Sequence, residues 1–286
     1  MLYLHPFYQP GAQITLNLRS CNSDDDKATR NAQATVVKAL TPFTMSQVLL
    51  VDINPPSPDI IPAVNSSFIL KVYDPRFLQH RKGSTSSRPH PWTLDAETTA
   101  ARRRSFSEDK HVFVPTWWPD DSDAAGWEEY YHANLTQMFK TELAAYARLR
   151  PLQGRCVPHC YAHGTLAFPP HSKRMIVPRV LLLSYIPGPS LRSVQASRVS
   201  PMLAHGLIGT IRDFGALGVI HDDLRAENVV LYKTKSHIAG AFVLDFGNAT
   251  VRSDEGDEQW EWIVAENDEP KQVEMILDRL GIDYAL

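Results

Sequence analysis

The chain has 286 residues, of which 43% are hydrophobic and 21% are charged, and its formal net charge is −3. This length and composition are ordinary for a globular protein with one large or two small domains. The weak charge gives no electrostatic reason to expect binding to nucleic acid or to a membrane surface. The N-terminus does not resemble a signal peptide, and no apolar run has membrane-spanning length. The three cysteines, Cys21, Cys156 and Cys160, do not indicate a disulfide framework and fit a reducing interior.

Strand-like segments dominate the first part of the chain. The sequence of residues 1 to about 34 predicts a strand and a polar loop. Three strand-like runs follow, at Ala34–Leu40, Val48–Ile53 and Phe68–Tyr73. The proline-rich stretch Pro55–Pro62 predicts a loop between the last two. Lys71 lies inside the third run, where its ammonium group needs a partner if it is buried. The alternative is an edge strand from which Lys71 reaches water.

A long polar insertion is expected from about residue 75 to 127, and its Ser, Arg, Pro and His content predicts partial disorder. Arg102-Arg103-Arg104-Ser105 is typical of a solvated charge run, with phosphorylation of Ser105 or a basic address tag as alternatives. Trp117 and Trp118 are expected either to pack the insertion onto the preceding strands or to form a surface for a partner.

The segment Trp127–Leu149 has the periodicity of a helix. Its apolar face holds Met138, Phe139, Leu143, Tyr146 and Leu149. Glu142 lies near the edge of this face, so it is expected to point inward, with a surface position as the alternative. A near-continuous apolar strand follows at Val177–Leu183, and the prolines after Ser184 break it.

A further helix is predicted after residue 200. Ser200 and Pro201 form a typical cap and first-turn pair, and Gly218 suits the C-terminal cap. Its buried face is traced by Leu203, Leu207, Ile208, Ile211 and Phe214.

Four potential metal ligands lie within eight residues: Cys156, His159, Cys160 and His163. Their spacing is too compressed for the usual two-arm geometry of a zinc site, so zinc binding is only a minor alternative.

The densest set of polar residues at strand ends lies in the last third of the chain. Two short apolar runs, Asn228–Tyr232 and Ala241–Phe246, are joined by a polar connection of hairpin length. If they pair antiparallel, the start of the first run lies beside the end of the second, which brings Asn228 next to Asp245. Asp223 is expected on the same rim. Two carboxylates and one amide there suit a hard cation such as magnesium.

These residues carry a family resemblance. His221-x-Asp223-Leu224-x-x-x-Asn228, followed by Leu244-Asp245-Phe246-Gly247, resembles the catalytic loop and the metal-binding Asp-Phe-Gly of the protein kinase-like superfamily. The resemblance implies that Asp223 accepts or orients the proton of the attacking hydroxyl. It also implies that Asn228 and Asp245 hold the Mg²⁺ ions that bridge the phosphates of ATP. His221 is expected to be a packed core histidine.

The same resemblance assigns roles to residues upstream. Lys71 would contact the nucleotide phosphates and pair with Glu142. The break after the Val177–Leu183 strand would be the hinge, where the backbone of Ser184 to Ile186 binds adenine. Leu183 would guard the back of the nucleotide pocket.

Several positions depart from the kinase pattern. Leu40 to Val48 matches the glycine-rich phosphate loop in length but contains no glycine, so side chains obstruct the approach of backbone amides to phosphate. Ile69 stands where many kinases have Ala and would narrow the pocket. Asp222 stands where protein kinases usually have Arg and many small-molecule kinases have Gly. The chain ends soon after Gly247, with helices expected at Asp254–Ala265 and Glu269–Leu280, so the platform for a peptide substrate is expected to be largely absent.

The resemblance implies a two-lobed, α+β, protein kinase-like fold. Residues 1–183 would form a β-rich N-terminal lobe with the insertion at about 75–127. Residues 184–286 would form the hinge and a reduced, truncated helical C-terminal lobe.

The expected function is ATP- and Mg²⁺-dependent phosphate transfer to a hydroxyl of a protein or a small molecule. The alternative is a pseudokinase that acts as a binding or scaffold module, and a third possibility is a small-molecule kinase of the aminoglycoside or choline type. The expected partners are ATP and an acceptor, without nucleic acid or membrane, and the expected location is intracellular and cytoplasmic.

Overall fold

The structure is a computed structural model that describes residues 6–21, 28–53, 67–85, 87–106, 118–169, 171–234 and 237–285. The predicted loop Pro55–Pro62 lies outside these residues, as does Trp117. Contacts within the chain define two compact units. The first comprises Met1–Phe139 and Cys160–Ser184, and the second comprises Lys140–His159 and Tyr185–Leu286.

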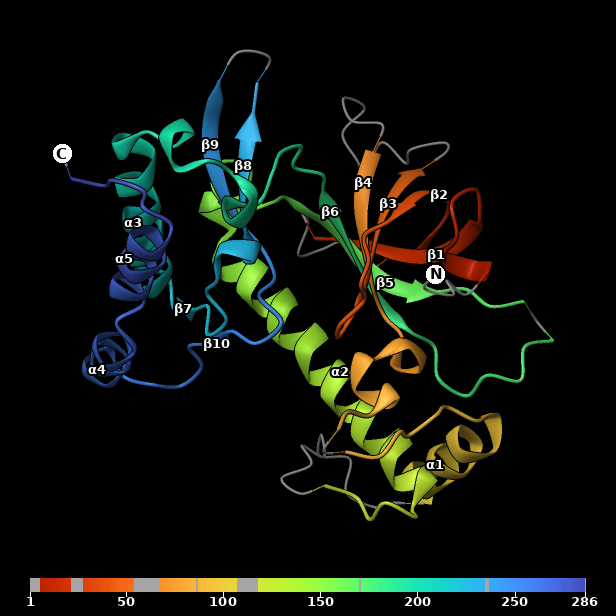
Figure 1. Ribbon diagram of the computed structural model, residues 1–286. Coiled ribbons are helices and arrows are strands. Elements are labelled where there is room, and N and C mark those ends of the chain that lie inside the picture. Colours follow the sequence, from red (N-terminus) through yellow and green to blue (C-terminus); the bar gives the residue numbers. More distant parts are fainter. Residues whose placement is uncertain are drawn as a thin grey trace. The chain divides into compact units, whose positions relative to one another are not determined.

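The first unit is built around a barrel of six antiparallel strands (Figure 1). The strands are β1 (Gln13–Ser20), β2 (Arg30–Ala39), β3 (Gln47–Ile53), β4 (Ser67–Tyr73), β5 (Cys160–Leu166) and β6 (Arg179–Ser184). They are joined in the order β1-β2-β3-β4-β6-β5, and β1 closes the barrel by pairing with β5. Alternate residues of β1 and β3 are buried, as expected for strands with one face in a core. That core includes Leu16, Leu18, Leu49, Val51 and Leu70.

The closed barrel contradicts the predicted two-lobed kinase-like fold, which was wrong. The prediction expected a strand and a polar loop before residue 34 and did not give that strand a partner. Instead, β1 pairs with β2 on one side, with Leu16 opposite Ala32, and with β5 on the other, with Leu16 opposite Leu166. A strand that is paired on both sides leaves no edge there, so the sheet closes. The strands predicted near β2, β3, β4 and β6 are confirmed within a few residues at each end.

The described part of the insertion has regular structure, and the prediction of partial disorder stays a prediction for the rest of it. It contains the 3₁₀ helices η2 (Pro75–Phe77) and η3 (Gln79–Lys82), the helix α1 (Leu94–Phe106) and the start of the helix α2 (Ala124–Arg148). Aromatic side chains pack together within it: His80, His90, Trp118, Trp127, Tyr130 and Tyr131. Trp127 stacks on His90 with ring centroids 3.8 Å apart. Trp118 stacks on Tyr130 and stays 60% exposed.

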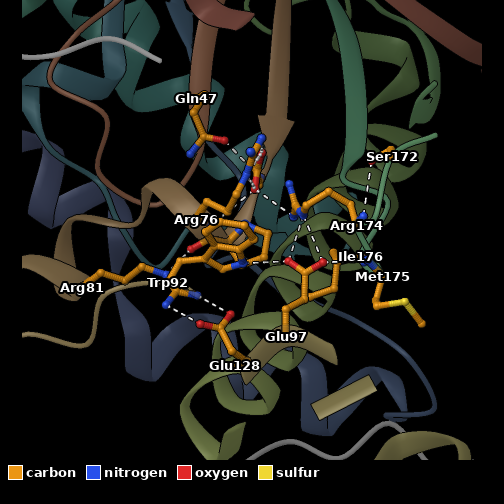
Figure 2. A network of polar contacts seen from close by, with 12 residues as sticks. Gln47, Arg76, Arg81, Trp92, Glu97, Glu128, Ser172, Arg174, Met175 and Ile176 are labelled. Carbon is orange, nitrogen blue, oxygen red and sulfur yellow. Dashed lines mark hydrogen bonds and ion pairs between the residues drawn. The ribbon is translucent and has the colours of Figure 1, made fainter. Parts of the chain in front are cut away.

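Buried ion pairs tie the insertion to the end of β4 and to the segment before β6 (Figure 2). Glu97 of α1 has no exposed surface and accepts hydrogen bonds from Arg174 Nε (2.9 and 3.0 Å) and from Trp92 Nε1 (2.8 Å). The backbone N–H groups of Met175 and Ile176 also donate to it, over 2.7 and 3.1 Å. Burial alone would raise the pKa of Glu97, but the hydrogen bonds and charge of Arg174 outweigh it and lower the pKa.

Asp74, directly after β4, is the second buried carboxylate of this network. Arg76 binds it through Nε (3.0 Å) and Nη2 (2.7 Å), Tyr8 donates to it over 2.9 Å, and Arg174 Nη2 lies 3.5 Å from it. Burial raises the pKa of Asp74, but its bonds to Arg76 outweigh this and lower it. Nearby, Arg81 and Glu128 form a buried two-bond ion pair, with distances of 2.6 and 2.7 Å. Such a network keeps its charges only because each has a partner.

The second unit holds the other helices and a hairpin. Its elements are the C-terminal part of α2, α3 (Pro201–Ala216), β7 (Val219–Ile220), β8 (Val229–Lys233), β9 (Ile238–Val243), β10 (Thr250–Val251), α4 (Asp257–Asn267) and α5 (Glu269–Arg279). The hydroxyl of Ser200 accepts the N–H of Leu203 over 3.2 Å, and Gly218 has φ +83°, so both predicted caps of α3 are confirmed. The helix α3 packs against α5, and Trp260 of α4 donates to Gly215 O over 2.8 Å. The helices α4 and α5 confirm the two predicted near the end of the chain.

Candidate functional site

The predicted hairpin is present in the second unit. The strands β8 and β9 pair antiparallel, with Val229 opposite Val243. One step beyond this pair, Leu244 N–H donates to Asn228 O over 2.8 Å. The amide of Asn228 and the carboxylate of Asp245 therefore leave the hairpin from neighbouring positions at the same end.

His221 connects the motif that contains Asp223 and Asn228 to the motif that contains Leu244 and Asp245. Its Nε2 lies 2.8 Å from Leu244 O, and its Nδ1 accepts the N–H of Asp223 over 3.3 Å. These bonds require a neutral ring with the proton on Nε2. Burial lowers the pKa of His221, and Phe246 packs against the ring at 4.9 Å between centroids. His221 is thus a packed, hydrogen-bonded core histidine, as predicted.

The carboxylate of Asp223 is partly exposed to solvent. Its side chain is 24% exposed, and Oδ2 accepts Arg225 Nη2 at 2.7 Å and Asn228 Nδ2 at 3.3 Å. Asn228 Nδ2 also donates to the backbone oxygen of Asp223 over 2.9 Å, which fixes the loop between them. The sequence interpretation missed Arg225, although its position two residues after Asp223 was a usable signal.

Asn228 and Asp245 have the donor atoms that a magnesium ion prefers. Because Nδ2 of Asn228 donates to Asp223, Oδ1 is the atom that Asn228 would offer to a cation. Asp245 is held at φ +69°, a backbone conformation that costs energy for a non-glycine residue and is common at functional sites. In the described residues no group of three or more His, Cys, Asp and Glu side chains could hold a metal ion. Magnesium at this pair would therefore need further oxygens, which nucleotide phosphates can provide.

Glu269, the first residue of α5, anchors the loop from behind, and the sequence interpretation did not find it. It is 5% exposed, and its carboxylate accepts the backbone N–H groups of His221 (2.9 Å) and Asp222 (2.8 Å). Burial raises the pKa of Glu269. Asp222 itself has φ +57° and accepts a hydrogen bond from the hydroxyl of Thr250. The carboxylate of Glu269 thus holds the loop in a conformation that Asp222 does not favour by itself.

Lys71 lies in β4 of the first unit. This strand is flanked by β3 and β6, with Lys71 opposite Val48 and Leu181, so the alternative of an edge-strand lysine is wrong. The side chain is 4% exposed, and Nζ lies 5.7 Å from the ring centroid of Tyr73. Ammonium groups are rarely buried without a role. Leu183 and Ser184 are buried at the end of the adjacent strand β6, and Leu183 lies opposite Ile69.

Glu142 and Ile186 belong to the second unit. Glu142 is fully buried on α2, on the same face as Tyr146, so the expectation that it points inward is confirmed. The strand β6 ends at Ser184, and Ile186 follows it without regular structure, which confirms the predicted break. Lys71 and Glu142 lie in different units, and their ion pair stays a prediction.

The connection between β2 and β3 is held in place by packing. Leu40 N–H donates to Val48 O over 2.9 Å, and Gln79 N–H donates to Thr44 O over 2.9 Å. Phe43 packs against the barrel core and meets Tyr8 edge-on at 6.3 Å. Its aromatic ring is therefore partly buried against protein, in the segment whose length matches the glycine-rich loop of kinases.

No model of a known protein family matches the chain, and no curated protein matches it. Within the described residues, helices that are long and apolar enough to cross a membrane are absent. The kinase-like resemblance therefore rests on the motifs and on the contacts between them.

Proposed function

We propose that the chain is an atypical kinase that uses ATP and Mg²⁺ and transfers the γ-phosphate to a hydroxyl of a protein or a small molecule. The observation that carries this proposal is the joining of the two motifs at Leu244. His221 contacts Leu244 O and Asn228 O accepts Leu244 N–H, so Asp223 and Asp245 belong to one hydrogen-bonded unit. Two carboxylates and an amide oxygen at one end of a hairpin suit phosphoryl transfer.

Asp223 would accept or orient the proton of the attacking hydroxyl. Its carboxylate is accessible, and the hydrogen bond from Asn228 Nδ2 restricts its rotation. Arg225 would orient the carboxylate of Asp223 until an acceptor arrives, because the two groups form an ion pair at 2.7 Å. Asn228 Oδ1 and Asp245 would hold magnesium, which neutralises charge on the transferred phosphate when it is bound.

Lys71 and Glu142 would complete the nucleotide site. Both are charged residues whose side chains are buried. Lys71 would contact the phosphates and Glu142 would orient Lys71, while Leu183, Ser184 and Ile186 would border the adenine.

The test combines binding and turnover. The melting temperature is measured with magnesium alone and with ATP plus magnesium, and release of ADP is measured with water as the phosphate acceptor. ATP at a hundred times its dissociation constant should stabilise the protein by about 2.7 kcal/mol, a shift of a few degrees. Wild type should show this shift and should release ADP.

Three variants assign the roles. Asp223→Asn should keep the shift and lose ADP release by about 10²- to 10⁴-fold, because it removes the proton acceptor and leaves the nucleotide site. Asp245→Asn should reduce the part of the shift that depends on magnesium. Glu227→Gln is the matched control, since Glu227 lies in the same turn with a side chain 58% exposed, and it should behave as wild type. Equal ADP release by wild type and Asp223→Asn would disprove the role of Asp223.

A binding module without catalysis is the second candidate, and the connection between β2 and β3 favours it. Phe43 and Thr44 are engaged in contacts within the protein, so this connection resists rearrangement around phosphates. In that case millimolar ATP with magnesium should leave the melting temperature unchanged.

The cytoplasm is the proposed location, because it supplies ATP and magnesium and keeps thiols reduced. Fractionation of cells that express the tagged full chain checks this.

A further inference from the structure

Two of the three cysteines meet at the seam that closes the barrel. Cys21 follows the last residue of β1, and Cys160 is the first residue of β5. Their sulfur atoms lie 3.4 Å apart. The two strands are paired up to this point, with Ser20 opposite Ala162, and Cys21 N–H donates to Tyr161 O over 2.9 Å.

The backbone geometry of both strands directs these side chains toward one another. Along β1, Leu16 and Leu18 face the core, so Cys21 continues the outward series of Asn17 and Arg19. On β5, the register shifts between Cys160 and Ala162, and such irregularities re-aim a side chain. The hydrogen bond from Cys21 N–H fixes the separation of the two strands beside the sulfurs.

Little movement separates the two thiols from a covalent bond. A disulfide bond is about 2.05 Å long, so the sulfurs need to approach by little more than an ångström. Neighbouring strands lie at a spacing that spans a disulfide without moving the backbone far.

The two thiols differ in access to a reagent. Cys21 is partly exposed, whereas Cys160 is 1% exposed. An external reagent therefore reaches Cys21 first, and Cys160 is placed to attack the sulfur of Cys21 afterwards. Cys156 is distinct from this pair, because its thiol lies beside Leu152 O, and burial raises its pKa.

We propose that Cys21 and Cys160 are a modification site at which a low-molecular-weight disulfide such as glutathione disulfide forms a reversible cross-link between β1 and β5. The thiolate of Cys21 attacks glutathione disulfide, forms a mixed disulfide and releases one glutathione thiolate. The thiolate of Cys160 then attacks the Cys21 sulfur and releases the second glutathione. The two protons lost by the cysteines end on the two glutathione molecules, which are the reduced products. This inference is independent of phosphate transfer.

The experiment equilibrates the full chain in glutathione buffers that range from reducing to oxidising. Alkylation of the remaining thiols, intact mass and peptide mapping under non-reducing conditions then identify the product. Wild type should lose two hydrogen atoms, with the peptides of Cys21 and Cys160 linked and Cys156 alkylated, and excess reduced glutathione should reverse the change.

Variants test the order of attack. Cys156→Ser is the control and should form the same cross-link as wild type. Cys160→Ser should stop at a mixed disulfide of Cys21 with glutathione, and Cys21→Ser should stay reduced. The proposal is overturned if wild type stays reduced in the most oxidising buffer, if it stops at the mixed disulfide, or if the link involves Cys156. Peptide mapping of wild type decides between these outcomes even where a variant does not fold.

Discussion

Glu97 in the first unit and Asp223 in the second are both paired with an arginine, and the two carboxylates differ in everything else around them. Glu97 is fully buried and accepts four N–H groups, those of Arg174 Nε, Trp92 Nε1, Met175 and Ile176. Asp223 is partly exposed, and the hydrogen bonds to its carboxylate come from Arg225 and Asn228.

This difference separates a structural carboxylate from one that is able to do chemistry. A carboxylate has about four acceptor sites, and Glu97 fills them with groups of its own chain. Such a group holds elements together and has no capacity left for a ligand. Asp223 retains acceptor capacity and access from solvent, which a proton acceptor requires. The described residues other than glycine that have positive φ also lie in the second unit, at Asp222, Asp245 and Asp268.

The largest expected effect comes from removing the structural carboxylate. Glu97→Ala leaves the guanidinium of Arg174 buried without its main partner, so the free energy of unfolding should fall by about 3–5 kcal/mol. Urea unfolding of wild type and variant measures the difference, with tryptophan fluorescence and circular dichroism as separate signals.

Glu227→Ala, which removes an exposed carboxylate, is the control for Glu97→Ala. Glu227 is 58% exposed and lies 3.7 Å from Arg192, so its loss should change stability by less than about 1 kcal/mol. Similar losses for Glu97→Ala and Glu227→Ala would show that burial does not distinguish these two carboxylates.

Acid should remove the stabilisation that the carboxylates of Glu97 and Asp74 give to the first unit. The folded pKa values of Glu97 and Asp74 lie below their usual values, because their arginine partners outweigh the effect of burial. Their stabilisation is therefore complete above about pH 4, near the pKa of unfolded carboxyls, and it is lost as pH falls through the lower folded values. The pKa shift of Glu269 has the opposite sign, because burial raises its folded pKa. The stability linked to Glu269 therefore falls as pH rises through that folded pKa and is regained in acid.

Two tryptophans report this difference. The indole N–H of Trp92 donates to Glu97, and that of Trp260 donates to Gly215 O in the second unit. In NMR spectra recorded during acidification, the native signal of Trp92 should disappear at a higher pH than that of Trp260. Disappearance of both at the same pH would contradict the comparison. In Glu97→Gln the signal of Trp92 should depend less on pH.

An intermediate loss is expected at Glu269, whose carboxylate accepts the backbone N–H groups of His221 and Asp222. Glu269→Ala leaves two buried N–H groups, those of His221 and Asp222, without their acceptor, so stability should fall by about 1–3 kcal/mol. The loss is smaller than for Glu97→Ala because no buried charge is left unpaired. Hydrogen exchange at the two amides should accelerate, and Glu266→Ala, an exposed change in α4, should leave both amides protected.

Local patterns in the sequence predicted the elements that local contacts form. The hairpin of β8 and β9 follows from two apolar runs and a short polar connection. The helix α3 begins where Ser200 caps it and ends before Gly218, and both signals lie within a few residues of the feature they determine. The spacing of the motifs singled out Asp223, Asn228 and Asp245, and the structure places Asn228 beside Asp223, while their roles stay predictions.

The rest depends on contacts between distant residues, which periodicity does not encode. Closure of the barrel requires β1 to pair with β5 as its second neighbour. The alternation of apolar and polar residues in β1 does not specify that partner. Pairs such as Arg174 with Glu97, 77 residues apart, hold the described part of the insertion, and its composition does not reveal them. Glu269 lies 48 residues from His221, in a helix start that looks like any other.

The smallest effect is expected at the ion pair of Arg225 with Asp223, which has the same chemical groups as the pair of Arg174 with Glu97. Arg225→Gln removes the arginine from Asp223, but the arginine is 54% exposed, so water replaces it and the free energy of unfolding should fall by less than about 1 kcal/mol. High salt should reduce even this difference, because solvent ions screen exposed pairs. Urea unfolding at low and high salt measures both quantities. A loss as large as that of Glu97→Ala would mean that Asp223 is part of the structural framework. A small loss leaves Asp223 as a carboxylate that the fold presents to solvent and does not use for its own stability.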